Sequence, residues 1–259
     1  MSKKTRIFAL FAAISFLTCG CYFNTKEQSQ SSNQQQITTK VGGLSNKEYT
    51  KLANLNFKSG DKPIVFINRN NSTLNKNWVK NRIDYQNLDS WNRTSAPVTA
   101  FLDENNLITN SQRTRQLWKP TGWHSNRPGA EIYNRGHLIA YSLSNGINKN
   151  GVYTGNASGD LDNPKNLFTQ TAFSNQKLQT YYERQVREAL YSGQKVIYQA
   201  TPIFRGDEKM ARGINLQAIS TNGMLNFNVY LFNVQPGYKF NYQTGRAIKD
   251  NTMKINQIY

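Results

Sequence analysis

Cysteine is nearly absent from the sequence, and its two copies stand where they cannot cross-link a folded domain. Cys19 and Cys21 both lie near the amino terminus, at the end of an apolar run. A domain formed by the rest of the chain must therefore depend on its hydrophobic core and not on disulfides. The length of 259 residues is sufficient for one large domain with such a core.

Acidic residues are also scarce. Aspartate and glutamate together number 15 against 32 lysines and arginines, which gives a net charge of +17. Removing the first 21 residues takes away three cations and no acid, so the remainder still carries +14. This excess favours a polyanionic partner, such as nucleic acid, anionic lipid or an anionic wall polymer. A solvated basic surface without a partner is the alternative on charge alone.

No apolar run is long enough to be an ordinary membrane span. The run Ile7–Leu17 has 11 residues, whereas a transmembrane helix needs about 20. Basic residues precede it, as in a secretory signal, and Gly20-Cys21 resembles a lipoprotein cleavage site. Residues 1–23 are therefore expected to be a signal peptide or membrane anchor. Three outcomes remain open: cleavage and release, lipid attachment at Cys21, or retention as an uncleaved anchor. Each places the domain outside the cytoplasm.

Composition divides the remainder into a linker and a domain. Residues 24–45 are rich in Gln, Ser, Asn and Thr and are too polar to bury a core. This composition predicts a flexible polar linker. Residues 46–259 form the predicted folded domain.

Short apolar runs bounded by Asn, Asp, Gly or Pro predict strands in this domain, and Asn222-Gly223 predicts a hairpin between two of them. One helix is expected from an N-cap at Ser174 to Leu190, because apolar residues recur at helical spacing and Ser192-Gly193 supplies a stop. The expected fold class is α+β, with an antiparallel β-sheet core. The predicted strands are residues 63–67, 98–102, 194–204, 215–220 and 225–232.

The candidate chemistry lies downstream of His137, one of only two histidines. Asn166, Asn175 and Glu183 follow it, and the last two are about two turns apart on the expected helix, near enough in direction to point toward one site. Amide and carboxylate oxygens suit Mg²⁺, which keeps several of its waters. A dense carboxylate cluster is missing, which argues against a two-metal site. The alternative is structural: Asn166 caps a turn, Asn175 belongs to the helix start and Glu183 is solvated.

Three segments carry a family resemblance: residues 133–140 (YNRGHLIA), 163–176 (NPKNLFTQTAFSNQ) and 182–183 (YE). Together they resemble the DNA/RNA non-specific endonucleases, and most closely the secreted streptococcal DNases and membrane-bound entry nucleases of that family. The resemblance extends over roughly residues 63–245. It implies a ββα-metal (His-Me finger) site, with Mg²⁺ as the cation, Mn²⁺ as its substitute and products that end in 5′-phosphate.

The resemblance also implies a role for each matching residue. His137 matches the general base and Asn175 the direct magnesium ligand, with Asn166 as the site asparagine that precedes it. Arg135 matches the arginine of the family motif. Glu183 matches the helix carboxylate that holds metal-bound water.

Other positions depart from the family pattern or stay outside it. Many members have Asp where this chain has Asn134, so a negative charge is missing beside the expected site. Asp160 and Asp162 lie in a polar loop and could bind a second, structural cation, although turn formation is the favoured interpretation. His124 lies between Pro120-Thr121-Gly122-Trp123 and the motif, and a packed turn is expected there.

Two functions follow from these features. The favoured one is an exported Mg²⁺-dependent endonuclease that binds DNA, with RNA as an alternative, through its phosphates. It would be extracellular, either secreted or tethered to the outer face of the bacterial membrane through the N-terminal segment alone, and no protein partner is expected. The alternative is a surface-tethered basic protein that binds DNA or wall polymer and has a decayed nuclease site. The completeness of the motifs favours the enzyme.

Overall fold

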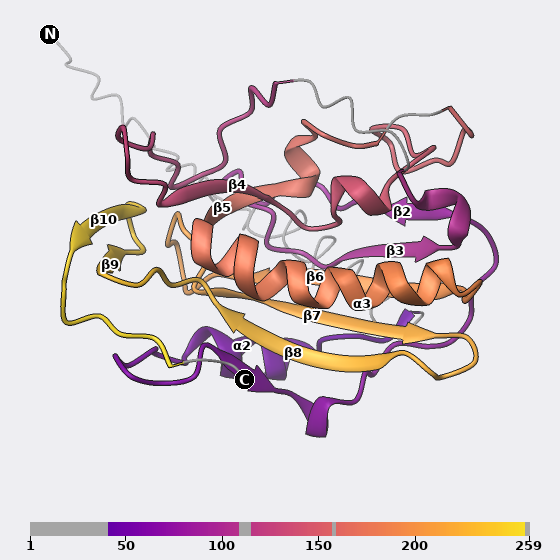
Figure 1. Ribbon diagram of the computed structural model, residues 1–259, viewed down its shortest axis with the longest axis horizontal. Helices are drawn as coiled ribbons and strands as arrows, with labels where there is room; N and C mark the ends of the chain where they lie inside the picture. Colours follow the sequence, from indigo (N-terminus) through magenta and orange to yellow (C-terminus); the bar gives the residue numbers. More distant parts are fainter. Residues whose placement is uncertain (1–40, 109–114, 157–158, 257–259) are drawn as a thin grey trace, which may run out of the picture.

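The centre of the molecule is a six-stranded antiparallel sheet with strand order β1-β8-β7-β6-β3-β2 (Figure 1). This computed structural model describes residues 41–108, 115–156 and 159–256. The predicted α+β class with an antiparallel core is confirmed. The strands are β1 (Ile64–Phe66), β2 (Arg82–Asp84), β3 (Val98–Leu102), β6 (Val196–Ile203), β7 (Gly213–Ser220) and β8 (Asn226–Phe232).

Strands β6, β7 and β8 form a meander at the centre of this sheet. The predicted hairpin between β7 and β8 is present, and its turn contains Gly223 in a left-handed conformation at φ 79°. A glycine takes this conformation without the steric penalty that other residues meet. The five predicted strands are therefore all present, with ends that differ by at most two residues.

One long helical segment covers the first face of the sheet. It starts with a π-helical stretch, η5 (Ser174–Gln179), and continues as α3 (Thr180–Tyr191). Figure 1 shows α3 lying across β6, β7 and β8. Leu178, Val186 and Leu190 are completely buried in the main core, and each such side chain contributes about 1.5–3 kcal/mol.

The prediction that Ser174 caps this helix is wrong. Helical backbone already begins at Ala172, directly after β5 (Leu167–Thr171). The hydroxyl of Thr171 accepts a hydrogen bond from the Ser174 amide at 3.1 Å. Thr171 thus performs the capping, because the strand ends one turn earlier than the position of the serine suggests.

The second face of the sheet is partly polar. Thr99, Gln199, Gln217 and Asn228 form a buried row across four strands. The N-terminal part of the domain covers this row. Gly43 fits against it because a Cβ there would lie only 2.1 Å from Gln199 Oε1. Helix α2 (Asn46–Ala53) follows and buries Leu52 beside Tyr230 and Phe232.

The predicted linker therefore ends earlier than its composition suggests. Leu44 is buried, and Ser45 forms a capping box with Glu48 at the start of α2. Residues 41–45 belong to the domain, so the boundary at residue 46 is wrong by five residues. Composition missed this because a short segment can pack on a core that other segments form. The remainder of the linker and the N-terminal segment 1–23 lie outside the described residues.

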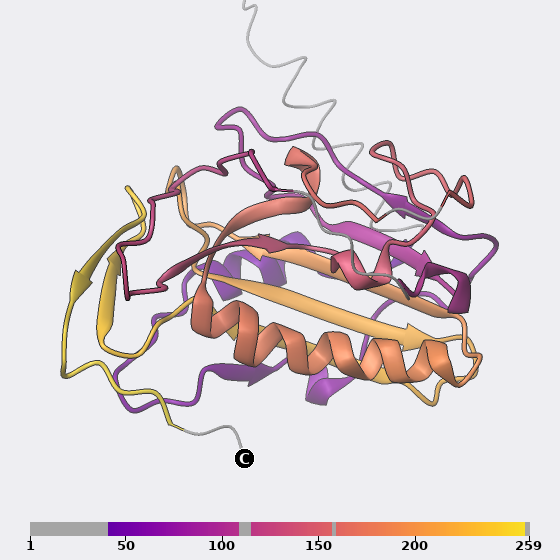
Figure 2. The same cartoon turned by 45° about the horizontal axis from the view of Figure 1, so that its top comes forward.

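Two small hairpins complete the fold. The pair β4 (Tyr133–His137) and β5 lies beside the start of the helical segment in both views (Figures 1 and 2). The pair β9 (Tyr238–Asn241) and β10 (Arg246–Lys249) follows β8. Short helical turns are η1 (Asn68–Asn70), η2 (Glu104–Asn106), η3 (Tyr141–Leu143) and η4 (Pro164–Asn166). Over the described ranges, no helix has the length and apolar content needed to cross a membrane.

The boundary at Val41 generates a prediction. A chain that starts at Asn46 should unfold about 2–4 kcal/mol more easily than one that starts at Val41, because it loses the Leu44 side chain and the Ser45 cap. Urea denaturation of the two chains measures this difference. Equal midpoints would show that residues 41–45 contribute nothing to stability.

Candidate active site

The candidate site is built on the β4–β5 hairpin and the helix that follows it. In the antiparallel register, Asn134 lies opposite Gln170 and His137 lies opposite Leu167. Side chains at directly opposite positions share a face, so Asn134 and Gln170 lie on the same side of the hairpin. Gly136 allows Gln170 to lie against β4, because a Cβ at this glycine would approach Gln170 Oε1 to 2.1 Å. The glycine of the motif thus permits the close approach of the Gln170 side chain to β4.

The imidazole of His137 is oriented by a backbone carbonyl. Its Nε2 lies 2.9 Å from Leu161 O, so this nitrogen carries a hydrogen and donates it. In neutral imidazole the other nitrogen, Nδ1, then carries the lone pair that can accept a proton. Gln116 Nε2 donates to the same carbonyl at 3.0 Å. Its 3.4 Å separation from His137 Nε2 is therefore an approach of two donors and not a hydrogen bond.

Gln179 connects the histidine strand with the helix. Its Nε2 donates to His137 O at 2.6 Å and to Glu183 Oε1 at 2.8 Å. Its Oε1 accepts from Gln170 Nε2 at 3.0 Å. Gln170, Gln179 and Glu183 are all buried. One side-chain amide thus joins the backbone of the candidate base to the candidate metal-associated carboxylate.

Asn175 is oriented by Asn134. The orientation of the Asn134 amide is assigned from its neighbours, with its nitrogen beside acceptors and its oxygen beside donors. Its oxygen then accepts hydrogen bonds from Asn175 Nδ2 and from Gln176 Nε2, both at 3.0 Å. Asn175 lies in the π-helical stretch, where its own carbonyl accepts from the Thr180 amide five residues later. Such π-helical turns occur frequently at functional sites. Because its nitrogen is directed to Asn134, the side-chain oxygen of Asn175 is the atom left to face a cation.

This donor set fits a hard divalent cation. Asn175 supplies an amide oxygen, and Glu183 supplies a carboxylate two turns further along the same helical segment. Oxygen ligands of this kind suit Mg²⁺ better than softer metals. Among the described residues, no group of three or more His, Cys, Asp or Glu side chains could hold a metal ion.

Arg135 is held by the segment that precedes the hairpin. Its Nε donates to Trp118 O at 2.6 Å, and its guanidinium lies 4.4 Å from the centre of the Trp123 ring. Asp162 fixes this segment, because its two carboxylate oxygens accept from the amides of Leu117 and Trp118, both at 2.9 Å. Two contacts therefore set the direction of the Arg135 side chain.

The loop aspartates have protein partners, as turn formation requires. Asp162 binds the backbone amides described above, and Asp160 Oδ2 accepts from Asn163 Nδ2 at 2.9 Å. Burial raises the pKa of Asp160, and the hydrogen bond from Asn163 opposes that rise. These contacts support the turn interpretation over a second cation site.

His124 lies on the outer side of the hairpin. Its Nε2 is 2.9 Å from Thr244 O, and its ring packs against Tyr133 with ring centres 5.8 Å apart. The Tyr133 hydroxyl in turn donates to Gly245 O at 2.8 Å. These contacts are those of a packing residue that joins the hairpin to the β9–β10 region.

Asn166 is completely buried, and both ends of its amide bind one residue. Its Oδ1 accepts from Ile139 N at 2.9 Å, and its Nδ2 donates to Ile139 O at 3.0 Å. Ile139 is two residues beyond His137. The Asn166 side chain therefore holds the backbone behind the histidine, whereas Gln179 and Asn134 connect the other expected site residues.

The sequence did not predict that Gln170, Gln179 and the backbone carbonyl of Leu161 contact the candidate site residues. Gln179 stands four residues before Glu183, which is a spacing that brings side chains together on a helix, so half of its contacts were visible in the sequence. The contact with His137 O was not visible, because it depends on how the hairpin packs. A backbone carbonyl such as that of Leu161 leaves no residue-type signal at all.

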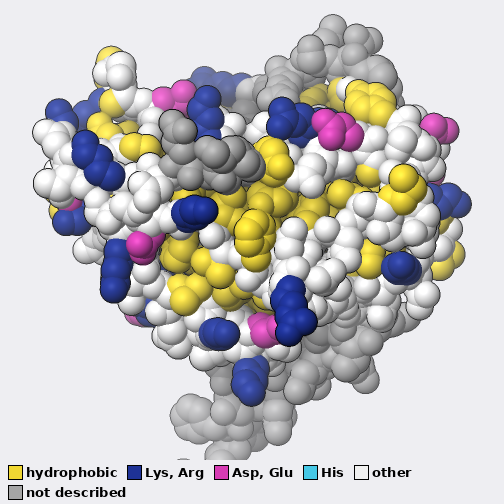
Figure 3. All heavy atoms as spheres, turned by 60° about the horizontal axis from the view of Figure 1, so that its bottom comes forward, with side chains coloured by type: hydrophobic (Ala, Val, Ile, Leu, Met, Phe, Trp, Pro, Cys, Tyr) yellow, Lys and Arg dark blue, Asp and Glu magenta, His cyan; other side chains and the backbone are white. Residues whose placement is uncertain are grey.

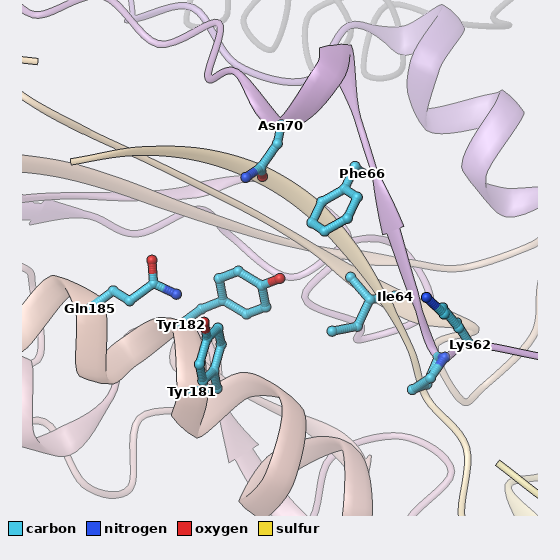
Figure 4. A pocket seen from close by; sticks show the side chains of 8 residues that line it. Lys62, Ile64, Phe66, Asn70, Tyr181, Tyr182 and Gln185 are labelled. Atoms are coloured by element: carbon cyan, nitrogen blue, oxygen red, sulfur yellow. The ribbon is translucent and has the colours of Figure 1, made fainter. Parts of the chain in front are cut away.

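A cleft lies elsewhere on the molecule. It has a volume of about 230 Å³, and its lining includes Ile64 and Phe66 of β1 and Tyr181 and Tyr182 of α3 (Figure 4). Phe66 is 64% exposed. Figure 3 shows that hydrophobic side chains gather in a band on the face at the bottom of Figure 1, with Lys and Arg spread around it. None of the expected site residues lines this cleft, so it is not the candidate active site.

Comparisons with known proteins agree with this geometry. A family model described as DNA/RNA non-specific endonuclease matches residues 71–222. This chain is 22% identical to a deoxyribonuclease from Streptococcus dysgalactiae subsp. equisimilis, over an alignment 295 residues long. The alignment covers 97% of this chain and 88% of the relative. This chain is also 31% identical in sequence to NucA from Streptococcus agalactiae, which has one crystal structure with magnesium ion bound and one with no metal bound. The two structures superpose with TM-scores of 0.64 and 0.61, covering 80% of this chain and 99% and 98% of theirs.

The burial of Asn166 generates a prediction. Asn166→Ala should lower the free energy of unfolding by about 2–5 kcal/mol, because the amide and carbonyl of Ile139 both lose their buried partner. Urea denaturation measures the loss, and the exposed Asn156→Ala serves as the control with a change within about 0.5 kcal/mol. An Asn166→Ala variant that keeps full stability but loses nuclease activity would instead place Asn166 in contact with substrate.

Proposed function

The chain belongs to the DNA/RNA non-specific endonuclease family and is a nuclease, and from this premise we propose a more specific activity. It is an exported Mg²⁺-dependent endonuclease that hydrolyses phosphodiester bonds of DNA, with RNA as an alternative substrate, and leaves 5′-phosphate ends. The observation that carries the proposal is the orientation of His137, whose Nε2 is held by Leu161 O at 2.9 Å. This contact leaves Nδ1 as the base.

His137 acts on the attacking water. Its Nδ1 takes a proton from the water as the oxygen attacks phosphorus, and positioned general-base catalysis of this kind contributes roughly 10²–10⁴-fold to a rate. The imidazolium that results still donates from Nε2 to Leu161 O, so the ring keeps one orientation before and after proton transfer. Without the hydrogen bond to Leu161 O, the neutral imidazole could adopt either tautomer and several side-chain rotamers.

Asn175 and Glu183 are the residues that would hold the cation, Asn175 through its amide oxygen and Glu183 through bound water. Mg²⁺, for which Mn²⁺ can substitute, supplies stabilisation of the negative charge that develops on the phosphate oxygens. Gln179 holds the Glu183 carboxylate at 2.8 Å, which fixes its position relative to the strand. The Arg135 guanidinium, held by Trp118 and Trp123, orients the scissile phosphate.

Export is proposed from the N-terminal segment. Basic residues before Ile7–Leu17 are typical of secretory signals, and all of the proposed site residues come later in the sequence than residues 24–40. The protein would act outside the cell, either released or tethered to the outer face of the membrane. In both cases the membrane would be reached through the N-terminal segment only.

The roles of His137 and Asn175 can be separated by experiment. His137→Ala should cleave plasmid DNA at least 10²-fold more slowly with unchanged DNA affinity, since it removes only the base. His137→Gly should recover activity with added imidazole, and more so as rising pH increases the free base. Asn175→Ala should respond to Mg²⁺ or Mn²⁺ concentration and not to imidazole.

His124→Ala is the matched control, because it removes the other histidine, and it should retain cleavage within a few-fold. Chelator should abolish cleavage by the unaltered protein. Near-normal cleavage by His137→Ala would end the assignment of the base. Retardation of plasmid without any cleavage in Mg²⁺ would favour a binding protein instead.

Phosphate contacts should dominate nucleic-acid binding, because the chain after Cys21 carries +14. The affinity for DNA should therefore fall steeply as salt rises, with little preference among sequences. Fluorescence anisotropy with catalytically inactive His137→Ala, at several salt concentrations and with unrelated duplexes, measures both properties. A salt-independent affinity, or strong preference for one short sequence, would contradict this prediction.

A further inference from the structure

Glu131 is an exposed carboxylate that contacts the hydrogen-bond network of the site. Its Oε1 accepts from Asn134 Nδ2 at 2.9 Å and from Gln176 Nε2 at 2.8 Å. Asn134 Nδ2 donates also to Tyr133 O at 2.9 Å. Glu131 precedes β4 and lies outside the three segments, 133–140, 163–176 and 182–183, that carry the family resemblance.

The Glu131 carboxylate and the Tyr133 carbonyl together determine which way the Asn134 amide points. A carboxamide can turn over and exchange its oxygen and nitrogen, but an ionised carboxylate and a backbone carbonyl only accept hydrogen bonds. These two acceptors therefore hold the nitrogen of Asn134 toward themselves and its oxygen toward Asn175. That oxygen receives Asn175 Nδ2 at 3.0 Å, which in turn directs the oxygen of Asn175 away from Asn134.

The same contacts explain how the chain can have Asn134 where many family members have Asp. An aspartate there would accept from Asn175 without help, whereas an asparagine needs a neighbour that fixes its orientation. We propose that Glu131 is a positioning residue for the cation ligand, and that Glu131 and Asn134 together replace the single carboxylate that the family motif has at position 134. This inference rests on the proposed function, because it concerns the cation held by Asn175.

The arrangement also explains why both residues are needed. Asn134 carries the hydrogen bond but no charge, and Glu131 carries the charge but contacts neither Asn175 nor its cation directly in the contacts described. Hydrogen-bonded amides polarise one another, so the charge of Glu131 strengthens the acceptor at Asn134 Oδ1. Placing carboxylates at both positions would set two like charges about 3 Å apart, which is unfavourable.

A double-mutant cycle tests the pair, with Mn²⁺ binding to the metal-free full-length protein measured by titration calorimetry. Glu131→Gln should weaken binding about three- to tenfold, because a charge-assisted hydrogen bond is lost and Tyr133 O alone then specifies the Asn134 orientation. Asn134→Asp should weaken it similarly through repulsion from Glu131. The double variant should bind more tightly than either single one, since the amide introduced at position 131 can donate to the carboxylate introduced at position 134. The Mg²⁺ concentration for half-maximal cleavage should follow the same order.

Glu188→Gln is the control, because it removes another exposed carboxylate, on α3 and with 67% side-chain exposure, and it should leave Mn²⁺ binding unchanged. Unaltered binding by Glu131→Gln would overturn the inference. So would binding by Asn134→Asp that equals or exceeds that of the unaltered protein, which is expected if only summed charge near the cation matters. If the unaltered protein neither binds Mn²⁺ nor cleaves DNA, the proposed function itself fails, which is a different result from equal binding by all four proteins.

Discussion

One buried amide, that of Gln179, fixes the distance between the two halves of the candidate site. The β4–β5 hairpin has no place in the hydrogen-bonded order of the six-stranded sheet, so sheet geometry does not determine where it lies relative to the helix. Side chains determine it instead. Gln179 joins His137 O to Glu183, and Asn233 joins the backbone of β5 to Ala211. Because these groups are buried, any displacement that breaks their hydrogen bonds leaves polar atoms without water or partner, which is costly.

The fold could be predicted where packing and periodicity coincide. Strands β6, β7 and β8 have the apolar, β-branched composition of buried strands, and α3 has apolar residues at helical spacing, so both were visible in the sequence. Strand β4 was not, because Asn134 and Gly136 are poor strand formers. It becomes a strand through its pairing with β5 and through the need for close contact between Gly136 and Gln170. The cap at Thr171 was missed for a related reason, since it depends on where the preceding strand ends.

The site could be predicted as a set of residues but not as a geometry. His137, Asn175 and Glu183 were found through motifs, and the structure connects them through neighbours that no motif contained. Asn166 was expected among them, yet its amide is used entirely on Ile139. The carbonyl of Leu161 could not have been found in any way, because every residue type has one. Sequence patterns therefore predict a set of candidate side chains, whereas their orientation comes from backbone atoms and amides placed by the tertiary fold.

The predominance of amides around the site has a physical consequence. Asn134 and Gln179 donate and accept hydrogen bonds, and Asn175 and Gln170 donate them. None of these amides carries charge, so they form a network that does not repel a nucleic-acid phosphate. A network of carboxylates would fix the same geometry but would oppose binding of a polyanion and would change with pH. Glu183 and Glu131 are the exceptions. Glu183 is buried and held by Gln179, and Glu131 accepts from the amides of Asn134 and Gln176. Limiting the charge to these two positions keeps negative charge where a cation can neutralise it and leaves the surrounding surface suited to a phosphate backbone.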